Sequence, residues 1–348
     1  MRKIRVIACL LSAALLSAAA AGCGNQNSQG NSSGANSGEA EVVTLRLAGQ
    51  SPQSSPAYAE TEAFCERVKE ESNGTLIIEY HPYNQLGDQA QVFEEVIMGT
   101  IDMSVTRPQE SIVPAAAIGT LPALATSAEE MKAIVGPGTV CDGLIRDALA
   151  EIGIRSYGLY FGGLTGVATN KEVTAPADPT ANKGVLIRTP TSATYTSSLS
   201  ALGFTTSPIA YSEIYTSMQT GVIDGYAGGM PHTALGDFSD LVKYYYDYSL
   251  IAEAMNCMIN QDVYDRLSDE HKAIIDKEFA ALAANSFDVF GDYEDECMQK
   301  LEDNGVTVVR FTEEERSEYS KFIRDEWTIL EDTFGKDLLD QVRAEANK

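Results

Sequence analysis

The fold of this chain is decided by residues 183–190, KGVLIRTP, in which an arginine follows a short apolar run. Val185, Leu186 and Ile187 predict a buried strand, because an uninterrupted run of large aliphatic side chains is typical of a strand covered on both faces. Arg188 would then lie at the carboxyl edge of that strand, where open α/β sheets bind their ligands. A guanidinium at this edge can bind a carboxylate through two charge-assisted hydrogen bonds. The stretch therefore predicts an α/β fold with an anion site.

The next residues predict a helix followed by another strand. Residues 208–221 (PIAYSEIYTSMQTG) indicate a helix that ends at Gly221. Residues 222–225 (VIDG) indicate the strand after it. The predicted order from residue 185 to residue 225 is therefore strand, helix, strand.

Together these residues resemble the solute-binding proteins of tripartite ATP-independent periplasmic (TRAP) transporters. The family pattern is a glycine four residues before the arginine, as in Gly184 and Arg188, then a helix, then L-Q-T-G-x-V-D-G, where this chain has Met218 in place of the leucine. The resemblance covers roughly residues 42–325. It implies a two-lobed α/β fold like that of periplasmic binding proteins, in which each lobe is a mainly parallel sheet flanked by helices and a long helix crosses both lobes. It also implies a binding protein that is not an enzyme and needs no cofactor.

The beginning of the chain predicts export. Three basic residues precede an apolar run at residues 6–16, which is too short to span a membrane. Residues 1–22 therefore predict a signal peptide. The small residues before Cys23 resemble a lipoprotein processing site, so Cys23 is expected to be lipidated, with ordinary signal cleavage as the alternative. Residues 23–41 would then form a lipidated, flexible tether rich in Gly, Asn and Ser.

Length and resemblance together predict two lobes. At 348 residues the chain exceeds what a single hydrophobic core usually fills. Strand and helix patterns alternate over residues 42–105, which indicates a mainly parallel sheet. A helix is expected to begin after Ser268 and, by the resemblance, to continue to about Asn304. We expect lobe one to comprise residues 42–162 and 254–294, lobe two to comprise residues 163–253 and 295–348, and hinges near residues 162 and 253.

The composition excludes generic nucleic-acid binding. The chain has 25 Lys and Arg against 50 Asp and Glu, a formal net charge of −25, whereas nucleic-acid binding relies on basic patches. The negative net charge of the chain repels an anionic ligand, so a basic pocket would be strong evidence of an anion-binding site. The spacing of cysteines 65, 141, 257 and 297 fits neither a metal site nor a dense disulfide scaffold, which leaves buried thiols and an isolated disulfide both open.

Arg107 is a second candidate cation. It follows the predicted strand at residues 101–105, at the carboxyl end, so it would face Arg188 across the cleft between the lobes. The alternative is an ion pair between Arg107 and nearby Glu110.

The resemblance implies further ligand-binding residues and two departures from the family. Many acid-binding members carry a second arginine where this chain has Thr165, and D-G-x-E-N where this chain has Asp224-Gly225-Tyr226-Ala227-Gly228. An aromatic residue is usual at Tyr211, where a tyrosine supplies an apolar wall with a hydroxyl. The expected site comprises Arg188, Tyr211, Arg107, Gln50, Thr165, Thr191, Tyr226 and Gly228.

The resulting hypothesis is an extracytoplasmic receptor, anchored to the membrane as a lipoprotein. It would capture a small organic anion between two lobes and deliver it to the membrane subunits of a TRAP permease. The alternatives are a neutral or zwitterionic ligand on the same scaffold, and the binding component of an ATP-driven importer.

Overall fold

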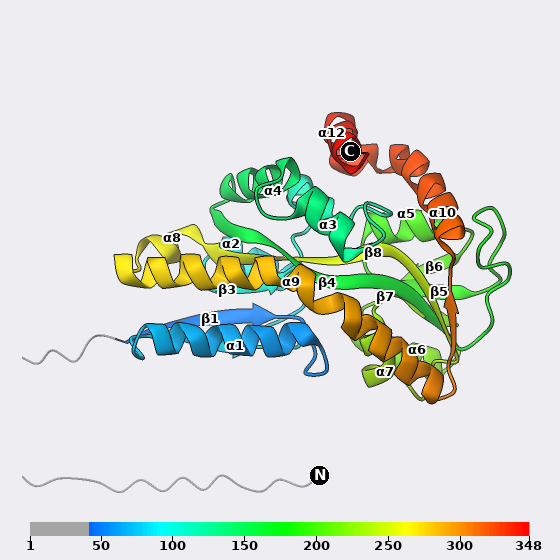
Figure 1. Ribbon diagram of the computed structural model, residues 1–348, viewed down its shortest axis with the longest axis horizontal. Coiled ribbons are helices and arrows are strands. Elements are labelled where there is room, and N and C mark those ends of the chain that lie inside the picture. Colours follow the sequence, from blue (N-terminus) through cyan, green and yellow to red (C-terminus); the bar gives the residue numbers. More distant parts are fainter. Residues whose placement is uncertain (1–41, 348) are drawn as a thin grey trace, which may run out of the picture. The chain divides into compact units, whose positions relative to one another are not determined.

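One mixed sheet runs through residues 42–347, the part of the chain that the computed structural model describes (Figure 1). The predicted signal peptide, Cys23 and tether lie outside these residues. The strand order is β2-β1-β3-β8-β4-β7-β5-β6, and β9 pairs with β8. The strands are β1 (Val43–Gly49), β2 (Leu76–His81), β3 (Met103–Thr106), β4 (Ile154–Thr169), β5 (Leu186–Thr189), β6 (Thr205–Pro208), β7 (Gly225–Gly229), β8 (Tyr244–Asn260) and β9 (Thr307–Arg310).

Two long antiparallel strands, β4 and β8, join the two halves of this sheet. On one side β1 pairs in parallel with β2 and β3, and on the other β5 pairs in parallel with β6 and β7. Each half is thus a mainly parallel sheet, which confirms the predicted fold class. The helices are α1 (Pro56–Glu71), α2 (Gln89–Ile97), α3 (Ala128–Val135), α4 (Val140–Ala150), α5 (Ala193–Ala201), α6 (Ile214–Gln219), α7 (Pro231–Asp237), α8 (Gln261–Asp265), α9 (Asp269–Asp303), α10 (Glu313–Asp325), α11 (Glu331–Phe334) and α12 (Lys336–Ala346), with 3-10 turns η1 (Pro114–Thr120), η2 (Tyr211–Glu213) and η3 (Glu326–Leu330).

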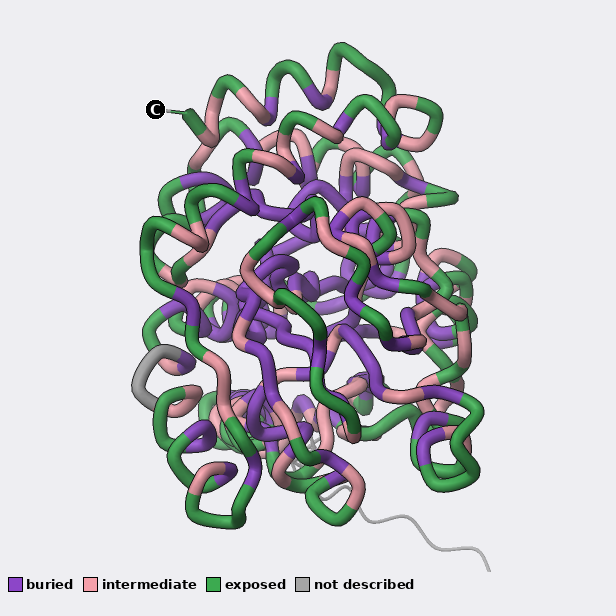
Figure 2. The backbone as a smooth tube through the Cα atoms, turned by 90° about the vertical axis from the view of Figure 1, so that its right-hand side faces the viewer, coloured by how far each residue is buried: buried purple, intermediate pink, exposed green. Residues whose placement is uncertain are grey.

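The apolar side chains form separate cores along the two halves of the long strands β4 and β8. One core, which defines lobe one, surrounds Leu47 and Phe64. Lobe two holds two smaller clusters, one around Ile187 and one around Ile214. Buried segments fill the interior, and exposed ones lie mostly on the outer helices and loops (Figure 2).

Helix α9 is the predicted long helix. It has 35 residues, and the side chain of Ser268 caps its first turn by accepting a hydrogen bond from the backbone nitrogen of His271. The helix contacts α1 and α3 of lobe one and α7 of lobe two, and Figure 1 shows it running past both. Its length, about 50 Å at 1.5 Å per residue, is what allows it to reach both lobes.

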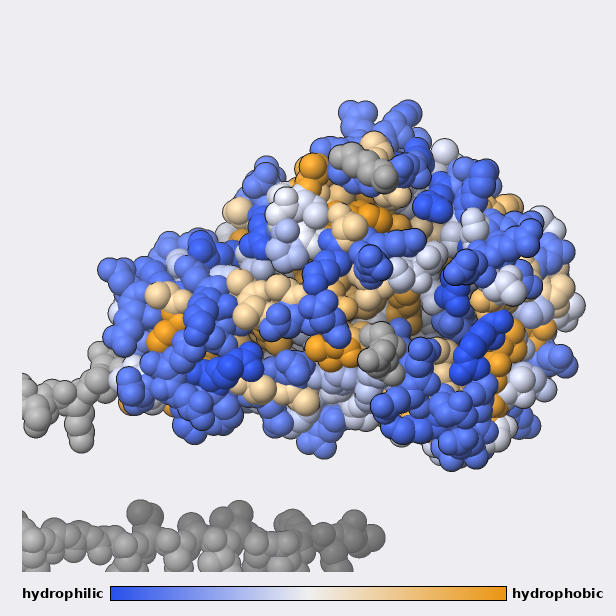
Figure 3. Space-filling view, viewed as in Figure 1, coloured by the Kyte–Doolittle hydropathy of each residue, from blue (hydrophilic) through white to orange (hydrophobic). Residues whose placement is uncertain are grey.

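The end of the chain differs from the predicted partition, which assigned residues 295–348 to lobe two. Trp327, Phe334 and Leu339 pack in the core of lobe one, and the indole nitrogen of Trp327 donates to the carbonyl of Pro122 at 2.9 Å. Burial of these large apolar side chains brings the C-terminal helices back to lobe one. The face seen in Figure 3 is largely hydrophilic, in keeping with the acidic composition.

Two local predictions need correction. The helix expected over residues 208–221 is divided into the short turn η2 and α6. The strand expected at 222–225 begins only at Gly225, because the side chain of Asp224 accepts a hydrogen bond from the backbone nitrogen of Leu186 and pairs with Lys171. The cysteines at positions 65, 141, 257 and 297 are buried, and Cys65, Cys257 and Cys297 are free thiols, which favours the alternative of buried thiols.

Candidate functional site

Residues from both lobes line a cavity of about 460 Å³. This volume lies within the range usual for small-molecule sites, which bury most of their ligand. Lobe one contributes residues after β1 and β3, and lobe two contributes β5, η2 and the start of α5. The charged side chains in the lining are Asp88, Arg107, Glu110, Arg188 and Glu253.

Arg188 lies inside β5, between the fully buried residues Ile187 and Thr189, rather than beyond the end of the strand. It is only 6% exposed, and its Nε donates to the carbonyl of Ile209 at 2.7 Å. Burial and then repulsion from Arg107 lower the pKa of Arg188 to about 10, so the group remains cationic at neutral pH. Among the side chains that the structure describes, no carboxylate forms an ion pair with Arg188. The site therefore holds a buried positive charge that lacks a counter-ion from the described part of the chain.

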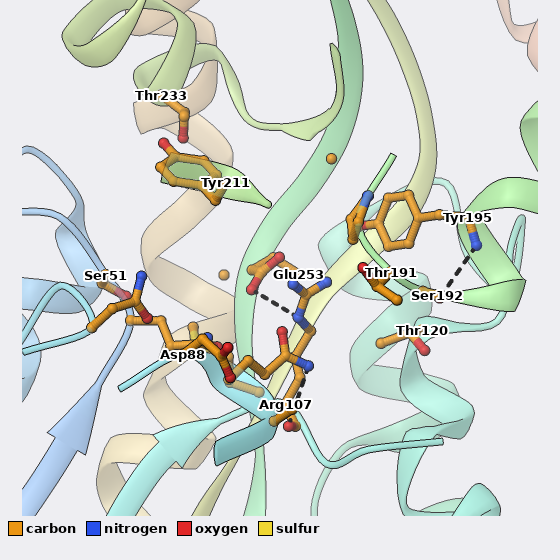
Figure 4. A pocket seen from close by; sticks show the side chains of 18 of the residues that line it. Ser51, Asp88, Arg107, Thr120, Thr191, Ser192, Tyr195, Tyr211, Thr233 and Glu253 are labelled. Carbon is orange, nitrogen blue, oxygen red and sulfur yellow. Dashed lines mark hydrogen bonds and ion pairs between the residues drawn. The ribbon is translucent and has the colours of Figure 1, made fainter. Parts of the chain in front are cut away.

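Arg107 differs from Arg188 because it has an acidic partner. Its Nε lies 3.5 Å from Oε1 of Glu253, and its guanidinium lies 5.9 Å from the centre of the Tyr195 ring. Figure 4 shows Arg107 and Glu253 pointing toward one another. Burial opposes the charge, but Glu253, Tyr195 and Glu110 together outweigh burial and raise the pKa of Arg107. The alternative ion pair with Glu110 is not formed in this structure.

Glu110 instead reaches across to lobe two. Its carboxylate accepts hydrogen bonds from the backbone nitrogen of Ala193 at 2.7 Å, the hydroxyl of Thr194 at 2.7 Å and the hydroxyl of Ser192 at 3.2 Å. These three residues form the beginning of α5, where unpaired backbone nitrogens favour a negative charge. Glu110 thus links a loop of lobe one to a helix of lobe two.

Other residues named from the sequence also border the cavity. Tyr211 lies in its wall and donates a hydrogen bond to Asp237 at 2.6 Å; burial and then this contact raise the pKa of Tyr211. Gly228 has a φ of +85°, and a Cβ there would lie 3.2 Å from the Tyr195 ring. Gln50 and Thr191 complete this group.

Thr165 and Tyr226 lie outside the lining. Thr165 is 3% exposed, and its hydroxyl donates to the carbonyl of Ile251 within the β4–β8 ribbon. The ring of Tyr226 packs 4.7 Å from that of Phe238 in a core of lobe two. Both side chains are buried behind the cavity wall, and Tyr226 pairs in register with Arg188 of the neighbouring strand.

Glu253 and Tyr195 are among the lining residues that were not predicted from the sequence. Glu253 is a lone acid in the apolar stretch of residues 250–259 (LIAEAMNCMI), and such an isolated charge in a buried strand could have indicated a functional role. Tyr195 sits in a helix of small polar residues and offered no comparable signal.

The β4 strand has an irregularity beside Glu253. Phe161 pairs with Ala254 and Leu164 with Ala252, so two residues of β4 oppose Glu253 alone, as in a β-bulge. The two residues are glycines, and Gly163 has a φ of +106°. The bulge coincides with the positions predicted as hinges.

The sequence pattern of the family described as bacterial extracellular solute-binding protein, family 7, matches residues 47–332. The chain belongs to this family. Its members are solute-binding receptors of TRAP transporters, not enzymes. Among relatives of this family 7 protein, the solute-binding protein RD1_1052 of Roseobacter denitrificans is 24% identical over 251 residues, which cover 72% of this chain and 75% of the relative. The ectoine-binding periplasmic protein TeaA of Halomonas elongata is 23% identical over 285 residues, which cover 79% and 82% respectively.

Solved structures of family members share the fold. A TRAP periplasmic solute-binding protein from Ochrobactrum anthropi has a TM-score of 0.78 and 23% identity, with 89% of this chain and 96% of that chain covered. One from Sulfitobacter sp., with bound β-D-galacturonate, has a TM-score of 0.76 and 23% identity, with 88% and 100% covered. The two-lobed architecture of this family 7 protein is therefore that of TRAP solute-binding proteins.

Proposed function

We propose that this protein captures a small organic acid between its two lobes and delivers it to a TRAP-type membrane permease. The observation that carries the proposal is Arg188, a buried cation in the cavity wall without an acidic partner in the described part of the chain. A buried charge is costly unless it is paired. A ligand carboxylate would provide the missing counter-charge.

The remaining lining favours a polar body on that acid. Gln50, Thr191 and Ser192 offer hydrogen-bonding groups, and Tyr211 offers an aromatic wall. The Sulfitobacter protein, which binds the sugar acid β-D-galacturonate, supports a carboxylate ligand with several hydroxyls. Closure of the lobes at the bulge near Gly162 would exclude water from this site.

A ligand screen followed by titration tests the proposal. A ligand that binds only the folded state raises the apparent melting temperature, so uronates, aldonates, amino acids and polyols can be compared directly. Calorimetric titration of the best acid with wild type and Arg188→Ala then measures the role of Arg188. We expect affinity to fall at least tenfold, since truncating one partner of a buried charge pair costs about 2–5 kcal/mol. Undiminished binding of the acid by Arg188→Ala would contradict the proposal.

A zwitterionic ligand is the second candidate. Asp88 and Glu253 place acidic groups in the same cavity as Arg188, and the relative TeaA binds ectoine. Comparison of an amino acid with the hydroxy acid of the same skeleton distinguishes the two. A larger melting shift with the amino acid would favour the zwitterion.

We further propose that the protein acts outside the cytoplasm as a lipoprotein anchored through Cys23. The family is extracellular by description, and the sequence before Cys23 supports lipidation. Among the described residues, none of the helices has the length and apolar character to cross a membrane.

A further inference from the structure

Glu253 is held in a defined position in the cavity wall. It lies in β8 between the buried residues Ala252 and Ala254, and its side chain is only 13% exposed. It packs over Gly162, where an added Cβ would lie 2.9 Å from the Glu253 Cγ. Because Gly162 has no side chain, the Glu253 side chain has room to lie over it, with its carboxylate near Arg107.

The consequence is an unequal pair of cations. Both guanidiniums line one cavity, yet Arg107 faces the Glu253 carboxylate while Arg188 has no ion pair with a carboxylate of the described chain. Two opposite charges only 3.5 Å apart largely cancel each other's electrostatic field at the position of a ligand group. Of the two arginines, Arg107 is thus offset toward a ligand by a neighbouring carboxylate, whereas Arg188 is not.

We propose that Glu253 is a specificity-determining residue, which neutralises Arg107 and thereby restricts the site to ligands with a single carboxylate. This inference rests on the proposed binding of an acid at Arg188. A second ligand carboxylate near Arg107 would meet the negative charge of Glu253, and like charges at such a distance repel in a partly desolvated site. A hydroxyl at the same place can donate to Glu253 and accept from Arg107, so the favoured class is a monocarboxylate with an uncharged, hydroxylated far end.

Matched acids and an isosteric substitution test the proposal. Galactonate, gluconate and erythronate are titrated beside galactarate, glucarate and tartrate, which have the same skeletons with a second carboxylate. In Glu253→Gln the shape of the side chain is kept and Arg107 is left unneutralised. We expect the affinity for at least one dicarboxylate, relative to its monocarboxylate, to rise at least tenfold over wild type. Adding Arg107→Ala to this variant should remove the gain.

Exposed Glu318 provides the control for net charge, because Glu318→Gln removes the same charge far from any interaction with Arg107. It should leave the ratio of affinities unchanged. The proposal is overturned if the melting curve shows that Glu253→Gln is folded but titration finds no gain in its affinity for a dicarboxylate. This outcome counts whether or not wild type binds any of the acids. A gain that persists after Arg107→Ala would equally overturn it.

The proposed function fails by a different result. If wild type binds no acid, or binds acids equally well after Arg188→Ala, the carboxylate receptor is refuted whatever the Glu253 variants do. If wild type binds a monocarboxylate through Arg188 but Glu253→Gln keeps the wild-type preference, only the role of Glu253 is refuted.

Discussion

The carboxylate of Glu110 accepts a hydrogen bond from the backbone nitrogen of Ala193 at 2.7 Å, although the two residues belong to different lobes. Thr194 adds a second short contact to the same carboxylate, from its hydroxyl. Glu110 thus serves as an acidic cap on α5 that exists only while the lobes are close together. We therefore expect this contact to favour the closed arrangement and to strengthen ligand binding indirectly, without a contact between Glu110 and the ligand.

The first prediction concerns this cap. Glu110→Ala should weaken ligand affinity about fivefold, because a charge at a helix N-terminus contributes on the order of 1 kcal/mol. Calorimetry measures the affinity, and small-angle scattering of the ligand-saturated protein measures closure. Glu129→Ala is the control, since Glu129 is an exposed acid in the first turn of α3. Equal affinities and equal scattering for wild type and Glu110→Ala would refute the role of the cap.

The second prediction separates charge from geometry at Arg188. Arg188→Lys should recover only part of the affinity lost in Arg188→Ala, because an ammonium cannot reproduce the planar two-pronged contact with a carboxylate. In addition, lysine has no guanidinium Nε, so Arg188→Lys would lose the hydrogen bond from this nitrogen to the Ile209 carbonyl. Full recovery in calorimetric titration would show that Arg188 supplies charge alone.

The third prediction is a pH dependence that arises from Glu294. This residue on α9 accepts a hydrogen bond from the backbone nitrogen of Leu164 beside the bulge. Burial, with smaller contributions from Asp247 and Asp295, raises the pKa of Glu294 to about 8. The native state therefore retains a proton that the unfolded state loses, and the free energy of unfolding should fall as pH rises from about 4.5 to about 8.

Glu294→Gln should remove this dependence, because the amide oxygen can still accept from Leu164 and carries no charge. At pH 9 we expect the variant to be more stable than wild type by on the order of 1–3 kcal/mol, given about 1.4 kcal/mol per pKa unit and relaxation of the site. Denaturant melts across the pH range measure this difference. Exposed Glu296, on the same helix, gives the control variant Glu296→Gln, and parallel stability curves for all three proteins would contradict the prediction.

The fourth prediction tests the glycine beneath Glu253. Gly162→Ala should reduce stability or ligand affinity by about 1–3 kcal/mol, the usual cost of overpacking, because the new Cβ would meet the Glu253 side chain. Melting and titration give both quantities. Gly143→Ala is the matched control: it lies in α4 with no atom within 4 Å of the added Cβ, so it should be neutral or stabilising. Identical effects of the two substitutions would exclude a specific role for Gly162.

The fifth prediction concerns the anchor. Cys23→Ala should move the protein from the membrane fraction to the soluble fraction, because the diacylglyceryl group that would hold it could no longer be attached. Immunoblots of fractionated cells measure the distribution. Retention of the variant in the membrane fraction would show that lipidation of Cys23 is not the anchor.

Local patterns in the sequence determined the elements on which the site is built. The apolar run before Arg188 was enough to predict a strand there, because a short run of aliphatic residues bounded by turn residues is a local signal for a buried strand. In the same way, Ser268 marked the start of α9 as a helix cap. Where the local pattern was ambiguous, as at residues 222–225, a hydrogen bond from the backbone nitrogen of the distant Leu186 to the side chain of Asp224 shifted the boundary.

Only the tertiary structure decided which distant residues share the cavity. Arg107 and Glu253 meet because β3 and β8 are neighbours in the sheet, although a long chain separates them and the nearer Glu110 was the obvious partner by sequence. The same strand order buries Thr165 in the ribbon, and apolar burial returns Trp327 to lobe one. A periodic pattern shows that a side chain will be buried, but its partners follow from how strands and helices assemble, since each pairing depends on the burial and electrostatics of the whole fold.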